Sequence, residues 1–189
     1  MEIIVVTRAD YFDGEAELIN LHFENEMEAL HIRKPENDSN KFRELMINVN
    51  PAYYDRIAIH QHHELADEYG LKRLHFPERQ RKLTAKKELG NYKKEGFTLS
   101  SSIHDLNDLA DLKLFDYVFY GPVFNSISKP GYLSKLSTDF RLPLRETTTK
   151  IIAIGGITFD LVEKIEEMDF DGAAICGAAW PSPLKQKIQ

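Results

Sequence analysis

The chain has 189 residues, of which 42% are hydrophobic and 29% are charged, so it can bury a core of its own. Its 24 basic and 30 acidic side chains give a formal net charge of −6, which argues against a general nucleic-acid binder or a membrane-surface binder. A single cysteine excludes an intrachain disulfide, and no apolar run approaches the length of a membrane span. The N-terminus has no signal-peptide pattern and no linker-like tract interrupts the chain, so we expect one cytoplasmic domain over residues 1–189.

Short strand-like runs alternate with helical patterns along the chain. Strands are expected at about 3–7, 29–33, 56–60, 73–76, 97–101, 117–120, 151–154 and 173–176. Helices are expected at about 14–26, 39–48, 63–69, 85–94, 106–112 and 160–168, with Ser39 as an N-cap and Gly70 as a C-cap. Residues 131–149 carry Pro143 and three consecutive threonines, which leave room for at most a short helix.

This alternation predicts an α/β fold with a parallel sheet, because strands joined through helices require right-handed crossovers. Eight such units favour a closed (β/α)8 TIM barrel that is compact and has a shortened sixth helix. The chain is short for this architecture, so the connections must be lean. An open, doubly wound sheet is the alternative fold.

Two strand–glycine–helix junctions lie near the C-terminal end of the chain. The first is Ile151-Ile152-Ala153-Ile154-Gly155-Gly156-Ile157, and the second is Ala173-Ala174-Ile175-Cys176-Gly177. Successive junctions of this kind are where a βα barrel binds phosphate, because glycine lets a ligand approach backbone N–H groups at a helix start. Two ordinary tight turns are the alternative interpretation.

Histidines gather at the ends of the expected strands, where a barrel carries its chemistry. Six of the seven histidines lie there, namely those at positions 31, 60, 62, 63, 75 and 104. A zinc site at His31, His60 and His75 is one alternative, because barrels host such sites. No helical His-x-x-x-His pair and no carboxylate at these strand ends supports it, so no metal ligand is expected. His75 has a second interpretation as a hydrogen-bonded residue of the barrel interior.

Two cations at strand ends point to an anionic ligand. Arg33 shares a side of the sheet with His31, and a positive side chain directed into an apolar barrel mouth needs an anion beside it. Lys129 lies in a Ser-x-Ser-Lys loop next to proline and glycine, which is typical of an anion-binding loop. A structural ion pair and an exposed lysine are the respective alternatives.

An ordered set of motifs resembles the thiamine phosphate synthase family, which includes the TenI-type thiazole tautomerases. The resemblance runs over nearly the whole chain, and the family fold is a βα barrel. The segments that carry it are His31-Ile32-Arg33-Lys34-Pro35, Ile59-His60-Gln61, Leu74-His75-Phe76, Ser102-Ile103-His104, Gly121-Pro122-Val123-Phe124, Ser126-Ile127-Ser128-Lys129-Pro130-Gly131 and Ala153-Ile154-Gly155-Gly156-Ile157. The last of these segments is identical to a motif of the family.

The resemblance implies roles for these residues. The phosphate of a hydroxyethylthiazole substrate would lie at Gly155, Gly156, Cys176 and Gly177. The pyrophosphate of an aminopyrimidine substrate would face Arg33, Ser102, Ser126, Ser128 and Lys129, with His31 and His60 at the family's Gln and Asn positions. The resemblance implies that His104, Arg33 and Lys129 are catalytic. His104 matches the histidine of the tautomerases.

Departures from the family pattern affect the metal half of the site. Synthases hold Mg²⁺ with two aspartates, and this chain has Gln61 and Gln80 at the matching positions. The second cation of the strand-two motif is replaced by Pro35, although Lys34 is adjacent. Neutral amides are poor ligands for a hard cation. Mg²⁺ is therefore expected as a cofactor only if the protein is a synthase.

These observations leave three hypotheses for the function. A TenI-like thiazole-phosphate enzyme comes first, a synthase with a shifted metal site second, and a noncatalytic phosphate-binding regulator third. The expected partners are a small phosphorylated thiazole and, for a synthase, a pyrimidine pyrophosphate, with no nucleic acid or membrane. The sequence leaves a homodimer open.

Overall fold

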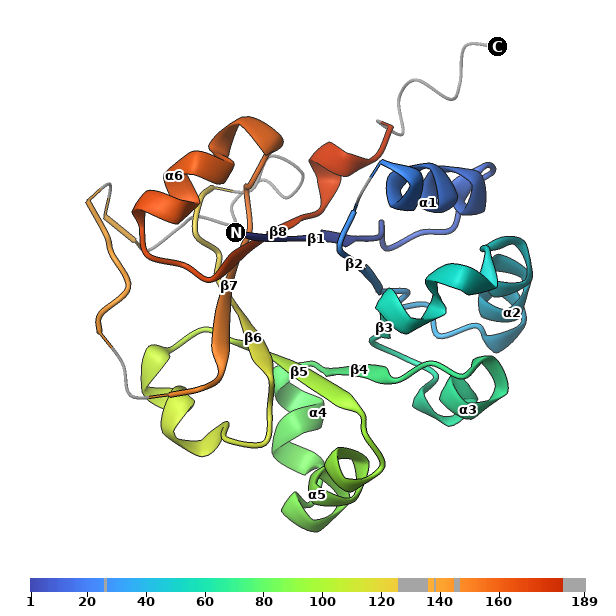
Figure 1. The fold of residues 1–189 in the computed structure, drawn as a ribbon, viewed down its shortest axis with the longest axis horizontal. Helices are drawn as coiled ribbons and strands as arrows, with labels where there is room; N and C mark the ends of the chain where they lie inside the picture. Colours follow the sequence, from blue (N-terminus) through green and yellow to red (C-terminus); the bar gives the residue numbers. More distant parts are fainter. Residues whose placement is uncertain (26, 126–135, 138, 145–146, 182–189) are drawn as a thin grey trace.

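In the computed structural model, eight parallel strands form a closed barrel with the helices outside it (Figure 1). The structure describes residues 1–25, 27–125, 136–137, 139–144 and 147–181. Each strand pairs with the next along the chain, and β1 pairs with β8, for instance Ile4 with Ala174. This closure confirms the (β/α)8 barrel and excludes the open sheet. The strands are β1 Glu2–Val6, β2 Ala29–Ile32, β3 Ile57–Ile59, β4 Arg73–Phe76, β5 Thr98–Ile103, β6 Tyr117–Tyr120, β7 Lys150–Ile154 and β8 Gly172–Ile175.

Most helices lie where the sequence predicts them. They are α1 Glu15–Glu24, α2 Ser39–Asn48, α3 Ala66–Tyr69, α4 Glu78–Leu83, α5 Lys86–Lys94 and α6 Val162–Glu167. Short 3-10 helices add η1 Pro51–Arg56, η2 His63–Leu65, η3 Leu106–Asp111, η4 Phe159–Leu161 and η5 Gly177–Ala179. Gly70 ends α3 in the left-handed conformation (φ 66°), as its C-cap position predicts.

Three expectations about helices were wrong. The N-cap of α2 is Asp38, whose carboxylate accepts from the amides of Asn40 and Lys41, so Ser39 is the first helical residue. The segment 106–111 is a 3-10 helix whose N-cap Asp105 accepts from the Asn107 amide. The helix α4, which begins directly after Pro77, was not expected at all.

The connection between β6 and β7 differs from the other connections of the barrel in its secondary structure. Its described residues, 121–125, 136–137, 139–144 and 147–149, contain no helix. The sixth helix is therefore missing from the described part of this connection, beyond the shortening that the sequence predicts. Proline and consecutive β-branched threonines, which are poor helix formers, account for this.

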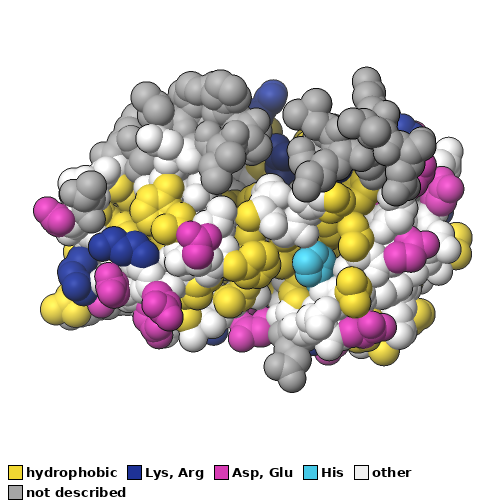
Figure 2. Space-filling view, turned by 90° about the horizontal axis from the view of Figure 1, so that it is seen from above, with side chains coloured by type: hydrophobic (Ala, Val, Ile, Leu, Met, Phe, Trp, Pro, Cys, Tyr) yellow, Lys and Arg dark blue, Asp and Glu magenta, His cyan; other side chains and the backbone are white. Residues whose placement is uncertain are grey.

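Two groups of buried side chains flank the strands. The larger group fills the space between barrel and helices, whereas the smaller group lies inside the barrel. The inner group consists of Ile4, Val6, Ala29, Tyr117, Phe119, Ile152 and Ala174, with Ile154 and Cys176 packed against it. In Figure 2 the outer face that carries α6 and α1 combines hydrophobic side chains near its centre with charged ones toward its edges. Among the described helices, none is long and apolar enough to cross a membrane.

Candidate functional site

Three histidines from neighbouring strands lie together inside the barrel. His31 of β2 and His75 of β4 have no exposed surface, and His60, just after β3, is 5% exposed. His31 Nδ1 lies 2.9 Å from His60 Nε2. The rings of His60 and His75 stack with their centroids 3.9 Å apart and an angle of 21° between their planes. The parallel register brings them together, because strand ends that are far apart in sequence are adjacent in the barrel.

Hydroxyl groups from β5 and β6 complete the polar interior. His31 Nε2 lies 2.6 Å from the Tyr117 hydroxyl. His75 lies 2.9 Å from Ser100 Oγ through Nδ1 and 3.0 Å from Ser102 Oγ through Nε2. His75 is thus a hydrogen-bonded interior residue. The roles of Ser100 and Tyr117 were missed from the sequence, although strand alternation places positions 100 and 102 on one side.

Burial keeps these imidazoles neutral. It lowers the pKa of His31 to about 3, with a smaller contribution from the positive charge of Arg73. Burial also lowers the pKa values of His60 and His75 well below their usual range, and the neighbouring histidines add to this effect. A neutral imidazole carries one N–H and one lone pair, so each ring can donate one hydrogen bond and accept another.

We expect the protein to lose stability as the pH falls from about 6.5 toward about 3. In this window the unfolded chain protonates His31 and the folded protein does not, so the unfolded state binds more protons and stability rises with pH. His31 alone contributes a slope of about 1.4 kcal/mol per pH unit. Urea unfolding at several pH values measures this slope. An unchanged slope in His31→Gln would contradict the assignment.

The three histidines do not form a metal site in their present orientation. One nitrogen from each lies within 4.8 Å of the others, so they are close enough to be considered. However, an imidazole binds a metal in its ring plane, and the nearly parallel planes of His60 and His75 do not converge on one point. Both nitrogens of His75 also face hydroxyls of β5. That no metal ligand is present remains a prediction.

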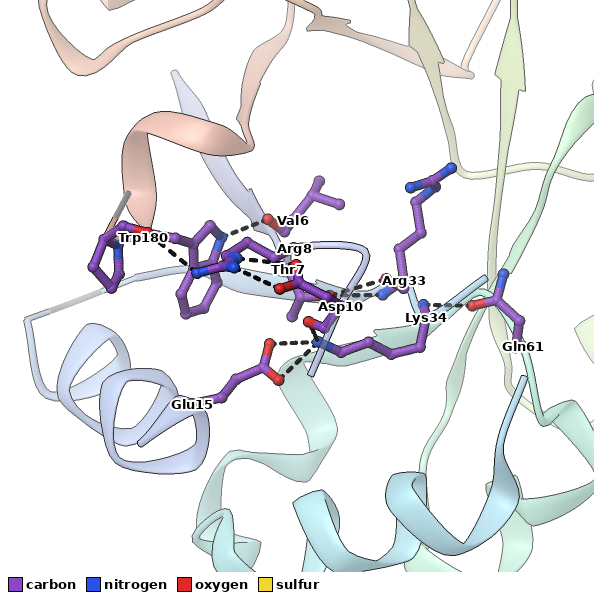
Figure 3. A network of polar contacts seen from close by, with 10 residues as sticks. Val6, Thr7, Arg8, Asp10, Glu15, Arg33, Lys34, Gln61 and Trp180 are labelled. Atoms are coloured by element: carbon purple, nitrogen blue, oxygen red, sulfur yellow. Dashed lines mark hydrogen bonds and ion pairs between the residues drawn. The ribbon is translucent and has the colours of Figure 1, made fainter. Parts of the chain in front are cut away.

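Lys34 and Arg33 leave the end of β2 in different directions (Figure 3). Lys34 is buried, and its Nζ lies 2.6 and 2.7 Å from the two carboxylate oxygens of Glu15. Burial lowers the pKa of Lys34 and raises that of Glu15, while their hydrogen bonds oppose both shifts. Lys34 therefore does not replace the cation that Pro35 removes from the mouth. Among the described residues, the Arg33 guanidinium has no ion-pair partner.

Neither glutamine at the expected metal positions is arranged as a metal ligand. Gln61 Oε1 accepts a hydrogen bond of 2.7 Å from the backbone amide of Lys34 (Figure 3). Gln61 therefore satisfies a backbone donor just after the end of β2. Gln80 is exposed on α4. Amide oxygens in these places do not fit a Mg²⁺ site, which calls for carboxylates.

His104 follows β5 and has a defined orientation. Its Nδ1 lies 2.7 Å from the Gly121 carbonyl oxygen, which can only accept, so Nδ1 carries the proton. In the neutral ring, Nε2 then carries the lone pair. The Glu78 carboxylate lies 4.0 Å from Nε2, and the His104 side chain is 56% exposed. The hydrogen bond and charge of Lys82 lower the pKa of Glu78, and nearby His104 adds a smaller effect in the same direction.

The glycines after β7 permit close backbone packing. Gly155 and Gly156 have φ values of 100° and 67°, and the connection after β6 packs against them through hydrogen bonds from Val123 to Ile154 and from Phe124 to Gly155. A Cβ on Gly156 would lie 2.5 Å from the Asn125 oxygen. Among the described residues, neither Gly156 nor Gly177 donates a backbone hydrogen bond to a carbonyl outside its own element. These contacts support the turn interpretation for Gly155 and Gly156, and phosphate binding at the two junctions stays a prediction.

Gly156→Ala is expected to destabilise the fold by about 2–3 kcal/mol, from left-handed strain plus a clash with the backbone. Gly96→Ala is the control, because Gly96 has φ 82° but no atom within 4 Å of its added Cβ, and should cost only about 1 kcal/mol. If urea unfolding gives the same loss of stability for both variants, the backbone at Asn125 moves away from the added Cβ and the close contact adds no cost.

The structure brings some of the expected site residues together, separates others, and does not describe the rest. His31, His60 and Ser102 are brought together by the buried network, while Arg33 and His104 are located at ends of β2 and β5. The phosphate candidates Gly155, Gly156, Cys176 and Gly177 follow β7 and β8. Ser126, Ser128 and Lys129 lie outside the described residues. The proximity of Glu78 to His104 depends on helix α4, which the sequence does not predict.

Comparisons with known proteins agree on one family. The family model described as thiamine monophosphate synthase matches residues 3–179. A thiamine-phosphate synthase of Staphylococcus carnosus (strain TM300) is 32% identical over 97 residues, which span 49% of this chain and about half, 46%, of that relative.

Two solved structures share the fold. The thiamine phosphate pyrophosphorylase of Bacteroides thetaiotaomicron is 24% identical, with a TM-score of 0.67 over 94% of this chain and 84% of the other. The thiamine phosphate pyrophosphorylase of Pyrococcus furiosus is 14% identical, with a TM-score of 0.67 over 94% and 86%. At these identities the two structures support the barrel fold alone.

Proposed function

Because this chain belongs to the thiamine monophosphate synthase family, we propose that it is an enzyme that moves a proton on the ring of a hydroxyethylthiazole phosphate. The observation that carries the proposal is the geometry of His104. Its Nδ1–H is fixed on the Gly121 carbonyl, so Nε2 is free to take and return a proton. The Glu78 carboxylate 4.0 Å away stabilises the imidazolium formed in between.

The phosphate of the substrate is proposed to bind at the glycine junctions. Backbone amides of Gly156 and Gly177, after β7 and β8, supply donors, and Gly155 and Cys176 complete the turns. Arg33, whose guanidinium has no ion-pair partner among the described residues, adds positive charge from the end of β2, two strands from β8 around the barrel. With its phosphate held there, the thiazole ring would lie across the mouth toward His104.

Synthase chemistry is less well supported by the residues present. Gln61 and Gln80 do not fit a Mg²⁺ site, and the Lys34 charge is used by Glu15. Synthase activity is the second candidate, since the relatives that match carry synthase names and Glu78 offers one carboxylate near the mouth. Lys129, Ser126 and Ser128 are assigned to the pyrophosphate only in that case.

A pair of assays tests the proposal. Purified protein is incubated with thiazole phosphate in heavy water, and NMR follows the loss of ring proton signal. In parallel, thiazole phosphate, pyrimidine pyrophosphate and Mg²⁺ are combined and thiamine phosphate is measured. We expect exchange in the first assay and no product in the second. Formation of thiamine phosphate would establish the synthase. If the protein catalyses neither reaction, the phosphate-binding regulator is the hypothesis that remains.

A further inference from the structure

A polar hollow lies at the end of the barrel opposite the mouth. Five of the residues that line it are the first residues of their strands, namely Glu2, Arg73, Thr98, Tyr117 and Lys150. Because all eight strands are parallel, their first residues meet at one end of the barrel and the loops of the candidate functional site at the other. The hollow has a volume of about 520 Å³, which is within the roughly 300–1,000 Å³ of typical small-molecule sites. None of the residues expected at the mouth lines it.

The charged side chains that line the hollow are more often positive than negative. The cations are Arg73, Lys93, Lys113 and Lys150, and the carboxylates are Glu2 and Asp116. Lys93 Nζ lies 2.8 Å from each carboxylate oxygen of Asp116, and Lys150 Nζ lies 3.1 Å from Glu2 Oε2. Each carboxylate is thus paired with one lysine, which leaves two positive charges in excess.

The excess charges belong to Arg73 and Lys113, which have no ion-pair partner among the described residues. Two further carboxylates near the strand starts do not compensate for them. Glu28 and Asp171 accept hydrogen bonds of 3.3 and 2.6 Å from backbone amides near the starts of β1 and β7, and neither lines the hollow. On a chain with a formal net charge of −6, this excess of positive charge is a local feature of one place.

Arg73 is held in place with donors to spare. Its Nε donates to the Asp55 carbonyl at 2.8 Å, whereas its two Nη groups have no hydrogen-bond partner among the described residues. Its charge also acts on the barrel interior. Burial lowers the pKa of His31 to about 3 and the charge of Arg73 adds to this, while burial raises the pKa of Tyr117 to about 12 and the same charge opposes the rise. A half-buried cation near an interior of low dielectric is screened less than a fully exposed one, so it gains more from an anion beside it.

The donor set favours phosphoryl groups over other anions. A guanidinium presents parallel N–H groups that match two oxygens of one phosphoryl group, and the ammonium of Lys113 adds a point charge. The hydroxyls of Thr98 and Thr148 also line the hollow and supply neutral donors. A water molecule takes up about 30 Å³ of the liquid, so the hollow has room for more than one phosphoryl group. Two excess charges also call for an anion that carries more than one negative charge.

We infer that this hollow binds a small anion with at least two phosphoryl groups, held by Arg73 and Lys113 at the N-terminal ends of the strands. The inference does not depend on the proposed function, since none of the residues proposed to hold or convert the thiazole phosphate lines the hollow. Chemistry in barrels of this kind takes place at the other end. The anion is therefore a stabilising or regulatory ligand, and it stabilises the folded chain by mass action.

Nitrogen-15 NMR of the labelled full chain shows where the anion binds. Sodium pyrophosphate is titrated into the protein at pH 7 without magnesium, and sodium chloride keeps the ionic strength constant. The amide signals of Asp116 and Lys150 report on the hollow, and those of Gly156 and Gly177 report on the mouth. We expect shifts at Asp116 and Lys150 that saturate. Shifts confined to Gly156 and Gly177, or no saturation at Asp116 and Lys150, would overturn the inference.

Lys113→Glu is the decisive variant, because it reverses one charge of the hollow at an exposed position without a partner among the described residues. We expect it to weaken pyrophosphate binding at the hollow about tenfold or more, as the loss of one charge-assisted contact implies. Lys87→Glu is the matched control, since it makes the same charge reversal at an exposed position of α5 outside the hollow. Its affinity should match that of the unchanged protein. An equal loss in both variants would show that only the net charge matters, and would overturn the site.

Two further titrations fix the ligand class and separate the hollow from the mouth. Inorganic phosphate carries one phosphoryl group and should bind more weakly than pyrophosphate; equal affinities would overturn the assignment of two phosphoryl groups. Arg33→Gln removes a cation at the mouth and should leave the pyrophosphate shifts of Asp116 and Lys150 unchanged, whereas Arg73→Gln should weaken them about tenfold. Thermal unfolding first confirms that each variant is folded. Loss of the shifts in Arg33→Gln but not in Arg73→Gln would place the anion at the mouth and overturn the inference.

Discussion

Replacing Lys34 by methionine is expected to lower the free energy of unfolding by about 3–5 kcal/mol. The substitution keeps the length of the side chain but leaves the Glu15 carboxylate, 2% exposed, without its partner. It also removes the hydrogen bond from Nζ to the Asp10 carbonyl. A buried charge without a counter-ion is among the most costly defects in a folded protein. Urea unfolding at pH 7 measures the loss.

Two controls show whether the cost comes from the unpaired charge. The double variant Lys34→Met with Glu15→Leu should recover most of the stability, because a buried ion pair is often replaceable by apolar side chains of similar size. Lys41→Met removes the exposed pair with Glu36 and should leave stability nearly unchanged, because water screens an exposed ion pair. If the double variant is as unstable as Lys34→Met alone, the hydrogen bond to Asp10 or side-chain packing, rather than charge pairing, explains the effect.

His104→Asn is expected to lower ring-proton exchange on thiazole phosphate by about 10²–10⁴-fold, or roughly 3–5 kcal/mol of barrier. Asparagine can still face the Gly121 carbonyl but cannot accept and return a proton at neutral pH. Affinity for thiazole phosphate should change little, because its phosphate is proposed to bind at Gly156 and Gly177. Turnover, affinity and melting temperature are measured on the same preparation.

Other variants separate catalysis from folding. His22→Asn removes a half-buried histidine that bonds to the Ala179 carbonyl on the outer side of the barrel, so it should leave exchange unchanged. Glu78→Gln removes the negative charge 4.0 Å from His104 Nε2 and should reduce exchange by about tenfold. A loss of less than about fivefold in His104→Asn would remove this residue from the mechanism.

The sequence alone determined the architecture of this protein. Strand-like runs of four or five residues alternating with helical patterns specify parallel strands and crossovers locally, and eight such units leave few folds to consider. Glycines at the end of β7 could also be identified, because a positive φ and a close backbone approach both favour glycine over other residues. The position of His104 at a strand end followed from the same local pattern, together with the family resemblance.

The tertiary structure decided what each of these side chains faces. Lys34 and Arg33 are adjacent in sequence, yet one is buried against Glu15 and the other is not, and only the packed barrel with α1 separates them. The contact between His31 and Tyr117 joins residues 86 positions apart, and Glu78 approaches His104 through a helix that the sequence did not predict. Strand and helix patterns arise from neighbours along the chain, whereas hydrogen-bond partners and burial arise from closure of the barrel. The strands could therefore be read from the sequence, and the polar network inside them could not.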